Sequence, residues 1–168
     1  MKKIILKIIL IFGIFGIGTN FIFKNIDPDI LNKIPFINGI IKNNQVDVTL
    51  SKCVDGDTAW FNIDGVATKV RFLYIDTPES TNTVEPYGKE ASNFTCSMLS
   101  NASEIRLEYD GDKKDKYNRI LAWIWADDIL IQEEIAKNGY VEKFYDYGNY
   151  KYEKRVSKAV NDIYGILK

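Results

Sequence analysis

The chain has 168 residues, 46% of them hydrophobic and 27% charged, which suits one compact domain and leaves little room for a second. It contains no histidine, which excludes an imidazole base and a histidine-ligated zinc site, so any hydrolytic chemistry must use carboxylates, arginines and a hard cation. Four of the 22 basic residues lie within the first 24 positions, which leaves 18 basic against 23 acidic residues and argues against a protein that coats DNA non-specifically.

The start of the chain has the pattern of an export signal. Lysines within the first seven residues precede an apolar run over 8–18, which has the length of a secretory signal, since a membrane span needs roughly 20 apolar residues. Cleavage after Gly18 would release the domain, whereas an uncleaved segment would anchor it in the membrane through residues 4–23. The sequence leaves both open, and both predict an extracellular domain. The expected segments are a signal peptide or anchor at 1–23, a linker or propeptide at 24–45 and the folded domain at 46–168.

The first half of the domain has the pattern of an antiparallel sheet. Apolar residues at Val46, Val48 and Leu50 alternate with polar ones, which predicts a half-buried strand. Asp-Gly turns then separate this strand from two more, in a meander. The first expected strand begins at 46, the second covers 58–63 and the third covers 66–75.

The second half mixes helices with two further strands. A polar surface loop over 79–87 precedes a segment whose apolar residues fall at helical spacing. The expected elements are a helix at 88–99, strands at 105–109 and 120–125, and helices at 129–138 and 150–163. Five strands with about three α-helices indicate an α+β domain built on a five-stranded OB-fold β-barrel, a fold that often binds nucleic acid or saccharides.

Two cysteines, Cys53 and Cys96, stand outside any metal-type spacing. In an exported protein they could form a disulfide, but nothing in the sequence places them close together. Two buried free thiols are the interpretation that we favour from the sequence.

Acidic residues at the ends of two predicted strands indicate a cation site. Asp57 follows an Asp-Gly turn, and Asp76 ends an apolar strand that also contains Arg71, a charge that needs a partner there. If the two strands are adjacent, Asp57 and Asp76 converge, with a backbone carbonyl near Thr77 as a third oxygen. This donor set suits Ca²⁺, although each acid taken alone could instead be a turn or capping residue.

Two further charges complete the predicted site. A polar loop delivers Arg119 at the start of a strand, and Arg71 and Arg119 facing a bound cation would clamp a tetrahedral phosphate, because guanidinium matches phosphate oxygens bidentately. Pro78 restricts the chain as it leaves its strand, so Glu79 projects in a defined direction.

Five segments occur in the order seen in thermonucleases: VDGDT, VRFLYIDTPE, PYGKEASNFT, DKYNRILAWIW and ILIQEEIAKNGYV. Together they resemble this family, the staphylococcal nuclease-like proteins, across roughly Val46 to Tyr147. The chain departs from the family pattern at Asn118, where glycine is usual, and in a shorter loop after Glu79.

The resemblance implies a role for each matching position. The implied roles are calcium coordination by Asp57, Asp76 and the main-chain carbonyl of Thr77, catalysis by Glu79, Arg71 and Arg119, and nucleotide binding by Lys116, Tyr117, Tyr145 and Tyr147. Glu79 would orient or deprotonate the attacking water, while the two arginines hold the phosphate and stabilise the transition state. Tyrosine rings can stack on bases without sequence preference.

The function expected from these residues is a monomeric, Ca²⁺-dependent endonuclease that cleaves DNA and RNA, single strands preferentially, to 3′-phosphate products. One alternative is a non-catalytic OB-fold module that binds nucleic acid or a surface partner, which the acidic balance disfavours. Another is a surface protein that uses calcium only for stability, which leaves Arg71 and Arg119 unexplained.

Overall fold

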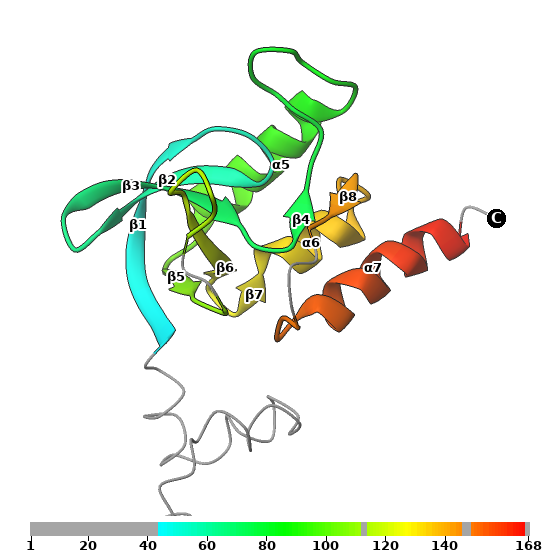
Figure 1. The fold of residues 1–168 in the computed structure, drawn as a ribbon. Coiled ribbons are helices and arrows are strands. Elements are labelled where there is room, and N and C mark those ends of the chain that lie inside the picture. Colours follow the sequence, from blue (N-terminus) through cyan, green and yellow to red (C-terminus); the bar gives the residue numbers. More distant parts are fainter. Residues whose placement is uncertain (1–43, 112–113, 146–148, 167–168) are drawn as a thin grey trace, which may run out of the picture. The chain divides into compact units, whose positions relative to one another are not determined.

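Strands far apart in the sequence close into a small barrel (Figure 1). The computed structural model describes residues 44–111, 114–145 and 149–166. The strands are β1 (Gln45–Cys53), β2 (Thr58–Ile63), β3 (Val66–Phe72), β4 (Ile75–Asp76), β5 (Ile105–Glu108), β6 (Ile120–Ala126), β7 (Ile129–Leu130) and β8 (Lys143–Phe144). The helices are α5 (Gly88–Asn101), α6 (Ile131–Lys137) and α7 (Glu153–Ile166).

The barrel consists of β1, β2, β3, β5 and β6. β1 pairs antiparallel with β2 on one side and with β5 on the other, and β2–β3 and β5–β6 extend the sheet in both directions. A parallel pair between β3 and β6 closes it. With three helices in the described part of the chain, this confirms the predicted α+β class and OB-fold barrel.

The β2–β3 hairpin shows why the predicted meander forms. Asp64 and Gly65 both adopt positive φ, 50° and 82°, which matches the right-handed twist of the flanking strands. Ile63 therefore pairs directly with Val66 across a two-residue turn.

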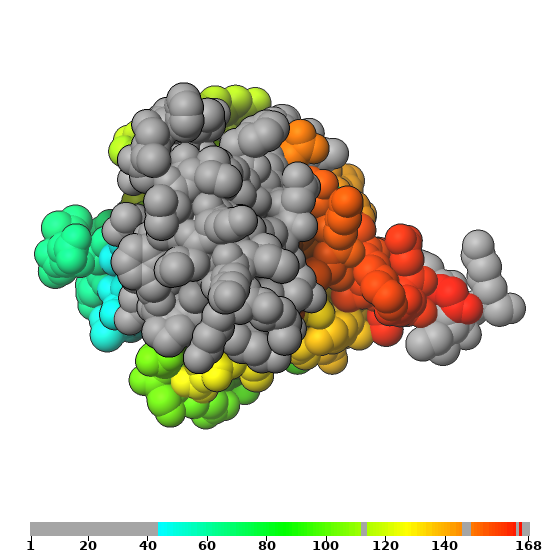
Figure 2. Space-filling model, turned by 90° about the horizontal axis from the view of Figure 1, so that it is seen from below, coloured from blue at the N-terminus to red at the C-terminus, as the bar shows by residue number. Residues whose placement is uncertain are grey.

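The core fills the barrel and extends beneath the helices. Its largest fully buried side chains include Phe61, Phe72, Leu107 and Trp123 from the strands. α7 runs beside α6, as the orange-red and yellow surfaces in Figure 2 show, and the buried Val156 of α7 belongs to the core. Burial of these apolar surfaces is the main force that holds the barrel and helices together.

Several element boundaries differ from the sequence-based expectation. β3 ends at Phe72 because the chain bends before β4, with Tyr74 at φ 77°. α6 begins at Ile131, since the two residues before it form β7 and pair with the end of β6. α7 lies three residues further along the chain than expected.

The two cysteines are bonded, which corrects the interpretation of two buried free thiols. Cys53 at the end of β1 and Cys96 in α5 form a disulfide with a Cα–Cα distance of 5.6 Å. Their sequence separation of 43 residues gave no indication of proximity, since only the docking of α5 on the barrel brings them together.

Part of the prediction lies outside the described residues. The leader at 1–23 and nearly all of the linker are not described, and neither is Tyr147. Within the described ranges, none of the helices has the length and apolarity needed to cross a bilayer.

Candidate active site

The turn between β1 and β2 carries the first acids of the site. Asp55 Oδ1 accepts a hydrogen bond from the Asp57 amide at 3.2 Å. Gly56, between them, approaches its neighbours so closely that a Cβ there would lie 2.6 Å from Thr77 Oγ1 and 2.9 Å from the Cβ of Ala91. The absence of a side chain therefore lets the turn place Asp57 against the residue that follows β4.

Arg71, at the end of β3, joins two carboxylates. Its Nη1 lies 2.7 Å from Asp57 Oδ1, and its Nη2 lies 2.6 Å from Asp76 Oδ1. The second oxygen of Asp57 accepts hydrogen bonds from the Thr77 amide at 2.8 Å and the Thr77 hydroxyl at 3.2 Å. The structure thus brings Asp57, Arg71, Asp76 and Thr77 together in a largely buried cluster.

A left-handed residue makes this convergence possible. Tyr74 lies between β3 and β4 with φ 77°, a conformation that is uncommon for a bulky side chain. Tertiary contacts hold it there: its ring stacks on Phe144 at 4.7 Å between centroids, and its hydroxyl lies 2.7 Å from Ser157 Oγ. The resulting bend turns Asp76 back towards Arg71 in the preceding strand.

Glu79 lies three residues after the end of β4 and is exposed to solvent. Its amide donates to Glu85 Oε2 at 2.8 Å, and its carbonyl accepts from the Glu85 amide at 2.9 Å, so these two residues close the base of the intervening loop. Partial burial raises the pKa of the Glu79 carboxyl, as do the charges of Asp55 and Asp76, whereas Arg71 lowers it. The pKa of Glu79 therefore depends on the charges of the buried cluster.

Negative charge is in excess at this corner of the barrel. Burial raises the pKa of Asp57 to about 7, although Arg71 opposes the shift, and the nearby Asp55 adds to it. The carboxylates gathered around the Arg71 guanidinium are Asp55, Asp57, Asp76 and Glu79. Positive charge in addition to that of Arg71 would therefore stabilise this group of carboxylates.

β8 brings an aromatic residue onto the cluster. β8 pairs with β4, so that the next residue, Tyr145, reaches Asp76. The Tyr145 hydroxyl donates to Asp76 Oδ2 at 3.4 Å, and its ring centroid lies 5.7 Å from Arg71 Cζ. The negative charge of Asp76 is the main cause that raises the pKa of Tyr145.

The loop before β6 holds Arg119 through a single carboxylate. Asp115 Oδ1 accepts the amides of Tyr117 and Arg119, both at 2.9 Å, and Asp115 Oδ2 accepts Arg119 Nε at 2.6 Å. Burial raises the pKa of Asp115, but the hydrogen bonds and charge of Arg119 outweigh it and lower the pKa. Asn118 adopts φ 63°, which asparagine tolerates and which explains why glycine suits this position.

The same loop presents an exposed aromatic ring. Tyr117 is 68% exposed, with Lys116 Nζ 5.0 Å and Arg119 Cζ 5.5 Å from its ring centroid. The parallel register pairs Arg71 with Leu121, so Arg119 lies just before the strand that flanks Arg71. The predicted residues therefore form two groups, one around Arg71 and one around Tyr117, on neighbouring strands.

Sequence reasoning missed two residues that hold this site. Asp115 had a usable signal, because an aspartate that opens a short polar loop commonly accepts backbone amides two to four residues later. Glu85 had none, since its contact with Glu79 depends on how the loop folds back.

The barrel and this corner define an OB-fold domain, and comparison with known proteins gives its family. Residues 69–164 match the family model described as Staphylococcal nuclease homologue. The chain is 40% identical over 124 residues to the thermonuclease of Staphylococcus hyicus, covering 72% of this chain and 73% of that protein. It is 42% identical over 130 residues to the thermonuclease of Staphylococcus intermedius, covering 72% and 76%.

The chain is also similar to a protein of Bacillus subtilis. The chain is 39% identical over 106 residues to the endonuclease YncB of Bacillus subtilis, covering 61% of this chain and 50% of that protein. The chain belongs to the staphylococcal nuclease family and is a nuclease, a hydrolase whose substrates are nucleic acids.

Proposed function

We propose that the chain is a calcium-dependent endonuclease that hydrolyses phosphodiester bonds of DNA and RNA and leaves 3′-phosphate ends. The observation that carries this proposal is the joining of Asp57 and Asp76 by the buried Arg71, at the start of the segment that bears Glu79. These groups could bind a cation and a phosphate and could activate a water molecule.

Calcium fits the residues at this corner. Asp57, Asp76 and the Thr77 carbonyl would hold it, and the excess of carboxylates over guanidinium charge favours a divalent cation with oxygen ligands. Among the described residues, no group of three or more carboxylate or cysteine side chains is arranged to hold a metal, so this set depends on a main-chain carbonyl and water. When bound, the ion would polarise the phosphoryl oxygen and offset its negative charge.

The arginines would bind the phosphate. Asp115 holds Arg119 through Nε, whereas bidentate recognition of a phosphate can use the terminal nitrogens. Arg71 contacts Asp57 and Asp76 through its terminal nitrogens, so a phosphate would share this guanidinium with the two acids. Negative charge that develops on the phosphoryl oxygens would then face two fixed cations.

Glu79 would serve as the general base. A water oxygen attacks phosphorus, its proton passes to the Glu79 carboxylate, the bond between phosphorus and the 5′ oxygen breaks, and the departing oxygen takes up a proton from solvent. The hydrogen bonds to Glu85 fix the backbone of Glu79, which supports a defined position for its carboxylate.

Bases of the substrate would stack on exposed rings. Tyr117 offers such a ring near two cationic groups, Lys116 and Arg119, and Tyr145 lies on the acid cluster. Stacking of this kind favours single strands, whose bases are accessible. Tyr147, outside the described residues, remains a predicted member of the same pocket.

An extracellular location is part of the proposal. The leader at 1–23 would export the domain, either as a signal peptide or as a membrane anchor, and the Cys53–Cys96 disulfide supports an oxidising environment. We propose that the domain acts as a monomer.

Digestion of single-stranded DNA by the full-length protein tests the function. We expect cleavage with calcium, little with magnesium, none with excess chelator, and 3′-phosphate ends on the products. Glu79→Gln and Arg119→Ala should each lower kcat by at least about 100-fold without unfolding the protein. Near-normal rates in both variants would refute these roles, and intact DNA with salt-sensitive binding would indicate a binding module.

A further inference from the structure

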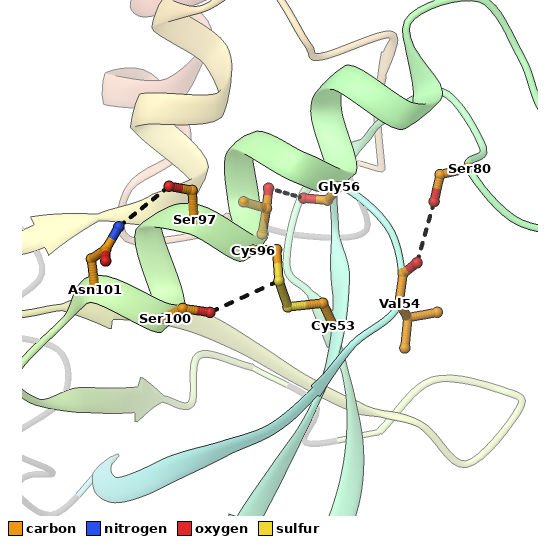
Figure 3. The surroundings of a disulfide bond; sticks show 9 residues. Cys53, Val54, Gly56, Ser80, Cys96, Ser97, Ser100 and Asn101 are labelled. Atoms are coloured by element: carbon orange, nitrogen blue, oxygen red, sulfur yellow. Dashed lines mark hydrogen bonds between the residues drawn. A yellow bond between two sulfur atoms is a disulfide. The ribbon is translucent and has the colours of Figure 1, made fainter.

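α5 lies beside the turn that carries Asp55 and Asp57, and two consecutive residues of this helix contact it. Cys96 is bonded to Cys53, the last residue of β1 before the turn. Thr95, which is 1% exposed, donates a hydrogen bond from Oγ1 to the Gly56 carbonyl at 2.7 Å. Figure 3 shows the disulfide that joins Cys96 of α5 to Cys53, and the nearby Gly56 whose carbonyl accepts the hydrogen bond from Thr95.

The segment has little room to move between these contacts. A Cβ at Gly56 would lie 2.9 Å from the Cβ of Ala91, one turn earlier in α5, and 2.6 Å from Thr77 Oγ1. The turn therefore lies between α5 on one side and a proposed calcium ligand, Thr77, on the other.

The same segment also contacts the chain that bears Glu79. The Val54 carbonyl accepts a hydrogen bond from Ser80 Oγ at 3.2 Å, and Ser80 directly follows Glu79 (Figure 3). A displacement of segment 53–56 would thus affect Asp57 directly and Glu79 through Ser80.

We propose that the Cys53–Cys96 disulfide and Thr95 are positioning residues for the nuclease site. They fix the segment 53–56 on α5, which sets the position of Asp57 and, through Ser80, of Glu79. This inference rests on the proposed function for its kinetic consequence, but the restraint itself is a property of the fold.

The kinetic consequence falls mainly on kcat. Asp57 and Glu79 belong to the group around Arg71, whereas Lys116 and Tyr117 lie on the separate loop before β6. Loss of positioning by a fraction of an ångström lowers the rate of chemistry while leaving base and phosphate contacts on that loop in place. A fall in kcat with a nearly constant KM therefore separates positioning from general loss of substrate binding.

Two sets of variants of the full-length protein test the proposal. One replaces both cysteines by serine, and the other is Thr95→Val, which removes the hydroxyl at nearly constant shape and keeps the disulfide. We expect each to lower kcat about 10-fold with KM changed by less than about 2-fold. Thr95→Ser, which restores the hydroxyl, should recover most of the activity.

Hydrogen exchange provides a readout that is independent of activity. The Val54 and Asp55 amides both donate to the Thr58 carbonyl at 3.2 Å, so a peptide that covers them reports on the turn. We expect its exchange to become at least about 10-fold faster in both variants. Val156→Ala, a core truncation in α7, is the matched control: it lowers global stability and should leave this exchange in the native state unchanged.

The outcomes distinguish the two proposals. Unchanged exchange and unchanged kcat in Thr95→Val would overturn the positioning role, even if the cysteine variant failed to fold. If exchange is faster in the variants but the disulfide-bonded wild type does not cleave nucleic acid, the proposed function is refuted and the restraint is established. Faster exchange with unchanged kcat would show that the turn does not position the catalytic groups.

Discussion

Gly88, the first residue of α5, lies against the backbone that carries Glu79. A Cβ at this position would be 2.1 Å from the Glu79 carbonyl oxygen and 2.6 Å from its carbonyl carbon. Because both atoms are backbone atoms, no side-chain rotation relieves the contact, and one of the two segments must move. Gly88→Ala is therefore expected to displace Glu79 without removing any chemical group from the site.

The expected loss follows from the distance. A carbon atom and a carbonyl oxygen need about 3.3 Å, so the two segments must separate by roughly 1.2 Å in total. If Glu79 takes about half to most of that shift, kcat should fall between about 10-fold and 100-fold, since a misplacement of about 1 Å can cost 100-fold. This range corresponds to about 1.4–2.7 kcal/mol of transition-state stabilisation.

The assay is steady-state cleavage of single-stranded DNA, with near-ultraviolet circular dichroism to confirm the fold. Gly165→Ala is the matched control, because Gly165 is also a helical glycine and a Cβ there would meet no atom within 4 Å. It should leave kcat unchanged and stabilise the protein by up to about 1 kcal/mol. A folded Gly88→Ala variant with kcat within about 2-fold of the wild type would refute the reasoning.

Further predictions concern stability. Replacing both Cys53 and Cys96 by alanine should lower the free energy of unfolding by up to about 4 kcal/mol in urea titrations, because their 43-residue separation closes a long loop. Glu108→Gln should cost about 2 kcal/mol in the same assay and leave kcat unchanged, since the buried Glu108 accepts hydrogen bonds from Trp125, Lys151 and Tyr152, to which the proposed mechanism gives no role. Because the folded pKa of Asp115 is lowered, its stabilising contribution is complete above its ordinary value of 3.8 and is lost as the pH falls through the folded value. The stability difference between the wild type and Asp115→Asn should therefore be present at pH 7 and shrink below pH 3.8.

The parts of the fold that were predictable depend on local chemistry. β2 was predicted from Thr58 to Ile63 with its observed bounds, because Asp-Gly turns bracket it on both sides. The two-residue strands β4 and β8 were not predicted, since their pairing joins Ile75 to Phe144 and exists only once the barrel has formed. The spacing of apolar residues indicates which face of an element is buried. It does not indicate which distant segment covers that face.

The same limit applies to the site. The apolar strand around Arg71 indicated that this charge needed a partner, and Asp57 and Asp76 are its partners in the structure. The contacts of Glu85 and Thr95 were beyond prediction, because each depends on how a loop or helix docks rather than on a local motif.

A charged residue in an apolar strand is therefore a useful signal, but charge balance decides what it means. Glu108 in β5 is only 4% exposed and accepts hydrogen bonds from Trp125 Nε1 at 3.0 Å, Tyr152 OH at 3.1 Å and Lys151 Nζ at 2.6 Å. One carboxylate meets one ammonium group and neutral donors, so the cluster is satisfied and ties the start of α7 to the barrel. Arg71, in contrast, meets more carboxylates than it can neutralise. A buried cluster that is short of positive charge gains stability when a cation binds, which is why the corner around Arg71, and not the one around Glu108, is the candidate active site.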